Sequence, residues 1–292
     1  MSDSSDDESN NSMDAEMKAK IAAFMDGVED DDDDEAEEED DDNSDGDLKD
    51  LDTPDDLPAN SIDCLVLGTS DLEKGRAAFE EMTGLKTGNL QAMRGGGGTK
   101  SVLCRLANNV YIDIMAPDGS RTDGTPGALA KLDEGELVAF HYAVRSPPEA
   151  INGMVPDSSW ALDKITMVGT GSPLEFKEED GPYKWDLTYL LGHELGGCVP
   201  SFVNWRQNEA HPTCRLEDSG AKIKKVAVRV PEGHKVLGML ENIDGIKIVA
   251  GKPKLVFEID TPEKGKVKFE GKNTMGVVMP GFEDTSHQSY NK

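Results

Sequence analysis

Two polar side chains, Cys64 and Asp113, lie near the ends of a segment whose pattern predicts a small folded unit. Cys64 lies in the aliphatic and β-branched run 62–67, and Asp113 lies in a second such run, 110–114, so both are expected on strands. Because residues alternate between the two faces of a strand, Cys64 is expected on the opposite face from Asp63. If Asp113 faces the same side as Cys64, the two share a site, since a cupped sheet with central polar groups makes a binding cleft.

Two stretches look like known catalytic or phosphate-binding motifs, and each departs from its motif at one residue. His193-Glu194 begins a His-Glu-x-x-His zinc-protease pattern, but Gly197 occupies the position of the second histidine. The glycine-rich run 95–101 looks like a phosphate-binding loop, but Thr99 stands where that loop needs a glycine before its lysine. Strands rather than a helix are expected after this run, so we interpret it as a flexible loop beside the cleft.

The elements that would position these residues repeat along the chain. The strand at 62–67 is followed by a helix that starts after Ser70-Asp71 and stops at Gly84. Further strands follow, including a hairpin with the turn Asn108-Asn109. Comparable patterns begin again later in the chain, so we expect up to three units, with the bounds 61–117, 136–206 and 222–271.

The charge is concentrated at the N-terminal end. Residues 1–60 contain 26 Asp or Glu and 3 Lys, a net charge of −23 out of −28 for the whole chain. This composition predicts a disordered acidic tail, with one stretch near 13–28 spaced like a short amphipathic helix. Residues 61–272 are nearly neutral and long enough to bury a sizeable core. Residues 273–292 lose the periodic pattern and are expected to form a C-terminal tail.

The same features exclude several classes of protein. An acidic chain repels nucleic acid and anionic lipid, so neither nucleic acid nor a membrane is expected as a partner. No apolar run approaches the ~20 residues that span a bilayer. The pattern of a secretory signal is absent, so we expect a cytoplasmic protein, with the nucleus as the alternative. The four cysteines have no paired spacing and are expected to be reduced thiols.

Several elements resemble the glyoxalase-like domain family of the vicinal oxygen chelate superfamily. Residues 62–68 with Asp71-Leu72 resemble its first strand and helix start, and Gly98-Thr99 with 111–117 resemble later elements of the same unit. The second half carries further elements in the expected order: Trp185, Gly196-Gly197, Pro200, Phe202, Trp205 and His211-Pro212. The likeness covers most of 61–262 and implies an α+β fold of two to three β-α-β-β-β units, whose cupped mixed sheet surrounds a cleft.

The resemblance also implies a divalent metal, held by a His on the first strand and a Glu on the last strand of a unit, that acts as a Lewis acid on the substrate. This chain has Cys64 and Asp113 at those positions, and its third unit has Lys225 and Glu270. His141 lies near the first-strand position of the second unit. Either Cys64, Asp113 and His141, with His211 as an optional further ligand, hold one zinc-like ion, or the metal site is lost and there is no cofactor, which we favour. Glu270 is the candidate catalytic base.

Four further residues are candidates for substrate binding through the resemblance: Thr99, Trp185, Trp205 and His211. We expect a glyoxalase-like protein that binds a small molecule in the cleft, with the turnover of a divergent lyase that acts on a carbonyl compound. The alternative is a non-catalytic interaction protein whose acidic arm binds basic protein partners. A homodimer fits either interpretation, and the third unit would either cover one end of the cleft or mediate pairing.

Overall fold

The computed structural model describes residues 59–88, 90–92, 98–146, 151, 161–169, 183–191, 193, 195–205, 211–214 and 216–272. Contacts divide the chain into Met1–Asp47 and Leu48–Lys292, and every described residue belongs to the second part. The helix expected near 13–28, the rest of the acidic tail up to residue 58 and the tail at 273–292 lie outside the described residues and stay predictions. Among the described residues, no helix is long and apolar enough to cross a membrane.

The first unit forms where the sequence pattern predicts it. Its elements are β1 (Ser61–Gly68), α2 (Leu72–Thr83), β2 (Leu90–Ala92), β3 (Thr99–Arg105) and β4 (Tyr111–Pro117). Asp71 caps α2 by accepting a hydrogen bond from the Lys74 amide at 3.0 Å. Gly84 ends the helix with a φ of 71°, a conformation that favours a residue without a Cβ. Asn108-Asn109 turn the hairpin with φ values of 61° and 55°.

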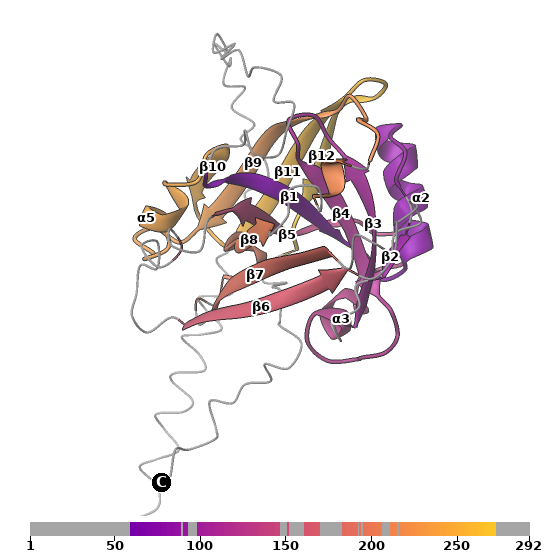
Figure 1. The fold of residues 1–292 in the computed structure, drawn as a ribbon. Helices are drawn as coiled ribbons and strands as arrows, with labels where there is room; N and C mark the ends of the chain where they lie inside the picture. The colour runs from indigo at the N-terminus through magenta and orange to yellow at the C-terminus, as the bar shows by residue number, and fades with distance from the viewer. Residues whose placement is uncertain are drawn as a thin grey trace, which may run out of the picture. The chain divides into compact units, whose positions relative to one another are not determined.

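Two units of the same topology form an eight-stranded mixed sheet in the order β2-β3-β4-β1-β5-β8-β7-β6 (Figure 1). The second unit supplies β5 (Val138–Arg145), β6 (Ala161–Gly169), β7 (Tyr183–Leu191) and β8 (Ser201–Trp205). In each unit the first strand pairs in parallel with the last, and β1 pairs antiparallel with β5 to join the units. The sheet curls, and the expected α+β fold is confirmed. The sequence analysis did not identify β6.

The third unit has the expected element order but a different strand order. Its elements are β9 (Lys222–Val230), α5 (Leu237–Leu240), β10 (Ile246–Ala250), β11 (Lys254–Thr261) and β12 (Gly265–Glu270). They form a second sheet in the order β10-β9-β11-β12. Here the first strand, β9, pairs with β10 and β11 instead of with the last strand of its unit. The curled sheet is therefore built from two repeated units, and the third adds a separate layer.

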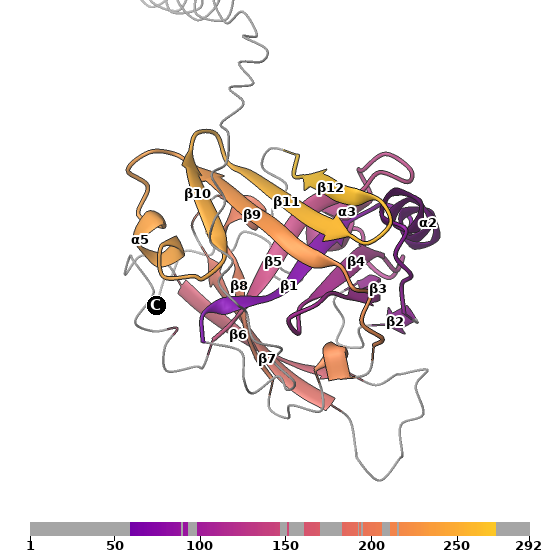
Figure 2. The same cartoon turned by 90° about the horizontal axis from the view of Figure 1, so that it is seen from above.

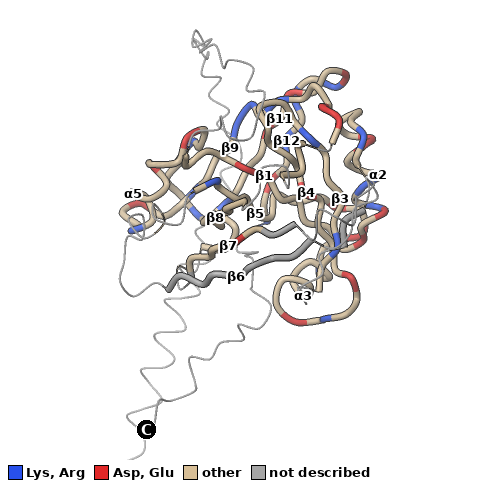
Figure 3. Tube along the Cα trace, viewed as in Figure 1, with Lys and Arg blue, Asp and Glu red and all other residues tan. Residues whose placement is uncertain are grey.

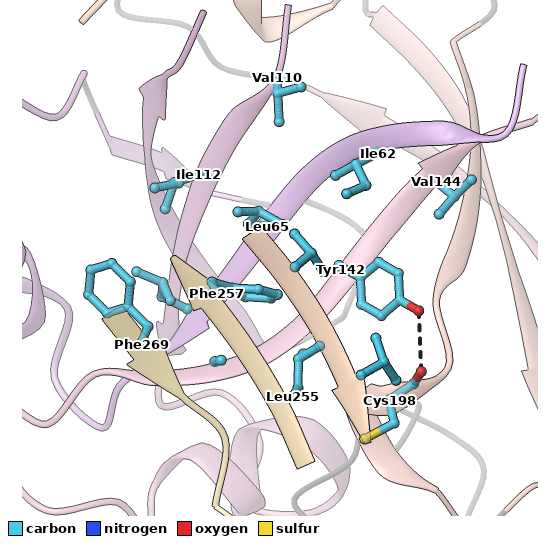
Figure 4. Close-up of a cluster of buried hydrophobic side chains, with 14 of the residues drawn as sticks. Ile62, Leu65, Val110, Ile112, Tyr142, Val144, Cys198, Leu255, Phe257 and Phe269 are labelled. Carbon is cyan, nitrogen blue, oxygen red and sulfur yellow. Dashed lines mark hydrogen bonds between the residues drawn. The ribbon is translucent and has the colours of Figure 1, made fainter. Parts of the chain in front are cut away.

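The main core lies between the two sheets (Figure 2). Figure 4 shows Leu255 and Phe257 of β11 and Phe269 of β12 meeting side chains of the first sheet, among them Leu65 and Tyr142. The Tyr142 hydroxyl donates a hydrogen bond to the Cys198 carbonyl at 3.2 Å, which satisfies a phenol buried in this layer. Each fully buried aromatic or aliphatic side chain contributes about 1.5–3 kcal/mol, so this layer anchors the curled sheet.

The opposite face of the first sheet, which we call the inner face, carries a second buried cluster. Its members are Cys64, Val66, Leu103, Tyr111, Leu129, Leu132, Val138, Phe140, Ala143 and Val203. At one end the helix α3 (Gly124–Leu129) packs on the sheet, where a Cβ on Gly68 would lie 2.7 Å from Leu129 Cδ2. At the other end Leu216 packs on the cluster. The inner face is therefore covered by chain at both ends of its strands.

Candidate functional site

The four central strands of the first sheet, β1, β4, β5 and β8, contain only three charged residues: Asp63, Asp113 and Arg145. By contrast, α2 and the second sheet carry many of the blue and red segments in Figure 3. Asp113 pairs with Val66, and Arg145 pairs with Val203, so both side chains lie on the inner face. Burial of a charged group in an apolar layer costs free energy unless the charge is paired. Each of these residues is therefore expected to have a partner or a functional role.

Asp63 reaches the inner face through a β-bulge. The register between β1 and β5 shifts between Ile62 and Cys64, which makes Asp63 an extra residue in the ladder. Strict alternation predicted that Asp63 faces away from Cys64, and this expectation is wrong. The Asp63 carboxylate accepts hydrogen bonds from Arg145 Nε at 3.2 Å and from Trp205 Nε1 at 3.3 Å. Trp205 packs on the same inner-face cluster as Cys64.

His211 completes a connected group that we call the Asp63 network, made of Asp63, Arg145, Trp205, His211 and Thr213. His211 is fully buried, with Nε2 at 3.1 Å from Asp63 Oδ1 and Nδ1 at 2.6 Å from Thr213 Oγ1. The Thr213 amide also donates to Nδ1, so Nδ1 accepts and Nε2 donates to the carboxylate. The network joins β1, β5 and β8 to the short helix at Pro212–Cys214.

The electrostatics of Asp63 are those of a structural carboxylate. Burial would raise its pKa, but the hydrogen bond from His211, with smaller effects of Arg145 and Trp205, holds the pKa below its usual value. Asp63 is completely buried and stays ionised because these donors surround it. The network therefore stabilises the sheet, and the carboxylate of Asp63 has few free hydrogen-bonding positions left for a ligand.

A second polar group lies nearby on the inner face. Asp113 and His141 lie on either side of Val66, and Ser101 lies on the same face of β3; we call these four residues the Val66 cluster. Val66 pairs with Asp113 of β4 on one side and with His141 of β5 on the other. Two strand spacings place the Cα atoms of Asp113 and His141 about 9–10 Å apart. Ser101 of β3 lies on the same face as Leu103, which pairs with Asp113.

The Val66 cluster contains buried polar atoms that have no partner. Ser101 Oγ, Asp113 Oδ1 and His141 Nδ1 make no hydrogen bond to any residue that the structure describes. The three residues are only 1%, 4% and 7% exposed, so solvent does not substitute for a partner. Each unpaired buried polar group costs about 1–3 kcal/mol, and native proteins keep few of them.

Asp113 is partly protonated at neutral pH. Burial raises its pKa to about 7, and the hydroxyl of Ser101, which lies close without forming a well-aligned hydrogen bond, lowers it only in part. A carboxyl group with this pKa gains and loses its proton near neutral pH, which is the property required of a general acid or base.

His141 is neutral, and its hydrogen bonds fix the position of its proton. Burial, with a smaller effect of His193, lowers its pKa to about 3. Its Nε2 accepts a hydrogen bond from the Ser201 amide at 3.1 Å and lies 3.0 Å from Ser201 Oγ. Because a backbone N–H can only donate, Nε2 carries no proton, and the ring proton is on Nδ1.

Cys64 lies between the two polar groups, beside its parallel partner Tyr111. Burial, followed by the charges of Asp63 and Asp113, raises the pKa of the thiol well above its usual value. Burial also raises the pKa of the Tyr111 phenol. Both groups therefore keep their protons, and a protonated thiol is a poor nucleophile and a poor metal ligand.

The inner face does not fit the metal site that the resemblance implies. Among the residues that the structure describes, no three His, Cys, Asp or Glu side chains gather closely enough to hold a metal ion. Cys64 retains its proton, and the unprotonated nitrogen of His141 already accepts a hydrogen bond from Ser201. The proposed set of Cys64, Asp113 and His141 is therefore no ligand set here, and we derive no chemistry from a metal.

Of the four predicted substrate-binding residues, Trp205 and His211 belong to the Asp63 network, Trp185 stacks on Trp205, and Thr99 lies near the Val66 cluster. Trp185 and Trp205 stack with their ring centroids 5.1 Å apart, and Trp205 and His211 both hydrogen-bond to Asp63. Thr99 is buried at the start of β3 and faces the same side as Ser101. Of the four, Thr99 is closest along its strand to the Val66 cluster.

Glu270 lies on β12 of the second sheet, outside the inner face. Its hydrogen bonds with Lys254, at 2.7 Å, and Lys268 lower its pKa to about 2. The side chain is 42% exposed. This position gives Glu270 no access to the Val66 cluster, so nothing in the structure supports its prediction as a catalytic base.

Sequence reasoning missed three residues of the inner face: Asp63, Arg145 and Ser101. The signal for Asp63 was a single acid inside the aliphatic run 62–67, which indicates a buried charge. Arg145 likewise ends an otherwise apolar strand. Ser101 gave no comparable signal, since a serine in a strand is ordinary.

Comparisons with known proteins give one family match and several distant structural likenesses. A family model described as Glyoxalase-like domain matches residues 62–243. No curated protein sequence matches the chain. The methylmalonyl-CoA epimerase from Mycobacterium tuberculosis is 17% identical over 53% of this chain and 97% of its own, with a TM-score of 0.36. The Mn(II)-bound glyoxalase from Novosphingobium aromaticivorans is 10% identical over 76% of this chain and 86% of its own, with a TM-score of 0.37. Likenesses this distant carry no argument about activity.

Proposed function

Because the chain belongs to the glyoxalase-like domain family, we propose that it binds a small molecule at the Val66 cluster and acts on it as a divergent lyase of carbonyl compounds. The metal-ligand set of the superfamily is replaced in this proposal by the side chains of Ser101, Asp113 and His141. Fold alone does not give the activity, so the proposal depends on the site.

One observation supports the proposal: three buried polar atoms lie on the same face of three different strands, two of them on either side of Val66, and none has a hydrogen-bond partner among the described residues. Together they would cost several kcal/mol if nothing bound them. A bound polar molecule would recover this free energy, and stability is commonly lower at sites kept for function.

Asp113 is the residue that would carry turnover. Its pKa of about 7 lets it deliver or accept a proton at neutral pH, beside a bound carbonyl group. His141 is neutral and is held in one orientation by Ser201, so it would position the ligand.

The test is thermal stabilisation by a panel of small carbonyl compounds, followed by a turnover assay on those that bind. A ligand should raise the melting temperature of the full chain and lose this effect in Asp113→Ala and His141→Ala. Asp260→Ala and His234→Ala, at an exposed and a half-buried position of the second sheet region, are the matched controls. The proposal fails if no compound stabilises the chain, or if the controls abolish binding as fully as the two site variants.

A second candidate function is favoured by the charge of −23 in residues 1–60. In this alternative the acidic arm binds basic protein partners, and the folded part is a scaffold. Replacing the acids of 30–42 with Asn and Gln in the full chain should abolish partner binding and leave carbonyl binding intact. Asp113→Ala should do the reverse, so the two functions are separable.

A further inference from the structure

We propose that the outer face of the second sheet binds an acidic segment of a partner protein. The inference goes beyond the proposed function, because this face points away from the main core and includes no residue of the Val66 cluster. In Figure 2 the second sheet lies in front of the first, and no helix or strand that the structure describes covers it. One face of an antiparallel sheet is commonly left open to solvent in this way.

Strand alternation separates the two faces of the second sheet. Val226 and Val228 of β9 and Phe257 of β11 are buried in the main core. The residues between them point outward, since successive side chains of a strand lie on opposite faces. Seven cations and three acids lie on the outer face, which we call the basic face: Lys222, Lys225, Arg229, Lys247, Lys254, Glu258, Asp260, Lys266, Lys268 and Glu270.

Each acid of the basic face lies beside two cations. Glu258 pairs with Lys225 of β9 on one side and with Lys268 of β12 on the other. The same register places Asp260 between two further lysines. Glu270 forms ion pairs with Lys268, at 2.6 Å, and with one further lysine, at 2.7 Å. The three acids therefore neutralise only part of the positive charge.

Positive charge remains on the basic face after these pairs are formed. Five of its cations make no ion pair with another residue in the described part of the chain: Lys222, Lys225, Arg229, Lys247 and Lys266. Residues 222–272 contain 12 Lys or Arg and 7 Asp or Glu, whereas residues 61–221 contain 14 and 23. The blue segments on the second sheet in Figure 3 belong to this excess. The basic face is therefore a positive surface on an acidic chain.

The dimensions of the basic face favour a short segment as its ligand. Four strands, with the length of β9 from Lys222 to Arg229, give a surface of roughly 15 by 25 Å. Charges in solution are screened over about 8 Å at physiological salt. A segment of about six to eight extended residues would therefore meet these cations without approaching the acidic residues elsewhere. A long polyanion such as nucleic acid would extend past the face and be repelled.

The kinds and spacing of the cations favour carboxylates. Six of the seven are lysines, whose ammonium group is a compact charge, whereas arginine supplies the fork that recognises phosphate in a bidentate manner. Lys266 and Lys268 alternate along β12 and lie about 7 Å apart on one face. An extended segment with an acid at every second position presents carboxylates at the same spacing.

The experiment measures binding of a labelled eight-residue peptide, in which Glu and Ser alternate, to the full chain by fluorescence anisotropy at 50 mM salt. This peptide should bind at least tenfold more tightly than one with Gln in place of Glu. The double variant Lys225→Gln with Arg229→Gln should weaken binding about 5- to 20-fold, because two unpaired cations are lost. The matched control, Lys86→Gln with Lys131→Gln, removes two exposed cations outside the second sheet and should leave binding unchanged.

A second variant and the salt dependence sharpen the test. Lys247→Gln with Lys266→Gln, both at exposed positions, should also weaken binding, and it replaces the first variant if that one does not fold. Circular dichroism checks the folding of each variant. Raising the salt from 50 to 300 mM should weaken binding of the acidic peptide about tenfold, because exposed charges are screened.

Four results would overturn the inference. The first is that the acidic peptide does not bind, and the second is that the matched control weakens binding as much as the basic-face variants, which would show an effect of net charge alone. The third is that replacing the acids of 30–42 with Asn and Gln tightens peptide binding more than tenfold, so that acids of this chain compete for the face. The fourth is that an eight-nucleotide DNA strand binds as tightly as the peptide and is lost in the same variants, which would make the face a general polyanion site.

Discussion

The Asp63 network and the Val66 cluster lie on the same inner face, and both are buried, but they differ in how completely their polar atoms are paired. Asp63 accepts hydrogen bonds from Arg145, Trp205 and His211. Asp113, also nearly fully buried, has one oxygen with no partner among the described residues. The pKa of Asp63 is correspondingly lowered, whereas that of Asp113 is raised to about 7.

Within one layer of side chains, this difference distinguishes polar groups that stabilise the fold from polar groups that are candidates for binding a ligand. A buried carboxylate with a full set of donors stabilises the fold, and its removal leaves those donors unpaired. A buried carboxyl group without donors destabilises the fold by itself, so its presence requires another explanation, such as a ligand. Three experiments can break or sharpen this comparison.

The largest effect is expected from Asp63→Ala. Removal of the carboxylate takes one buried acceptor from Arg145 Nε, Trp205 Nε1 and His211 Nε2, at a cost of about 3–5 kcal/mol in the free energy of unfolding. Chemical denaturation of the full chain measures this change. Asp260→Ala, at an exposed position of β11, should change stability by no more than about 0.5 kcal/mol. A loss below about 1 kcal/mol in Asp63→Ala would show that the network does not stabilise the sheet.

The next largest effect concerns the pH dependence of stability through Asp113. Its folded pKa of about 7 lies above its ordinary value of 3.8, so its contribution to stability is most favourable below pH 3.8 and is lost as the pH rises through 7. The full shift corresponds to a loss of up to about 4 kcal/mol. Asp113→Asn should remove this loss and be more stable than the unmodified chain at pH 8.

The contribution of Asp63 to stability depends on pH with the opposite sign, and it serves as the internal comparison for that experiment. Its pKa is lowered in the folded chain, so its contribution to stability is present above pH 3.8 and is lost as the pH falls below that value. Equal stability of Asp113→Asn and the unmodified chain at both pH 4 and pH 8 would contradict the raised pKa of Asp113.

The smallest effect is expected from Glu270→Gln. Glu270 pairs with Lys254 and Lys268 on a partly exposed strand, and such pairs contribute little in water, so stability should change by about 0.5 kcal/mol or less. Binding of a carbonyl ligand should be unchanged, as measured by titration calorimetry. A loss of binding would show that the second sheet contributes to the site and that the inner face alone does not define it.

Much of the fold could be predicted from local pattern. The cap at Asp71, the stop at Gly84 and the turn at Asn108-Asn109 are determined within a few residues of chain, and the structure has all three. Local pattern could not predict the strand order of the third unit. The sequence pattern of β9 would be the same whichever strands of the unit it paired with. Pairing is decided by which apolar faces meet, a property of distant segments.

The site was predicted less completely, and the reasons differ by residue. Asp113 and His141 were recognised as polar residues on strands, and the structure places them on either side of Val66. Their chemistry as metal ligands was inferred from the family pattern and is not supported by the arrangement of side chains. Asp63 was assigned to the wrong face because alternation assumes a regular ladder, and one bulge reverses it.

The sequence by itself determined most of the elements, the positions where repeated units begin and the presence of polar residues in apolar strands, because helix caps, turns and strand periodicity act over short stretches of chain. Only the tertiary structure decided which of those polar residues are paired. Whether a buried carboxyl group meets an arginine and a histidine, as Asp63 does, or only the hydroxyl of Ser101 among the described residues, as Asp113 does, depends on residues up to 148 positions away. This pairing sets the pKa of each carboxyl group and its contribution to the stability of the fold. It therefore distinguishes the stabilising Asp63 network from the candidate site.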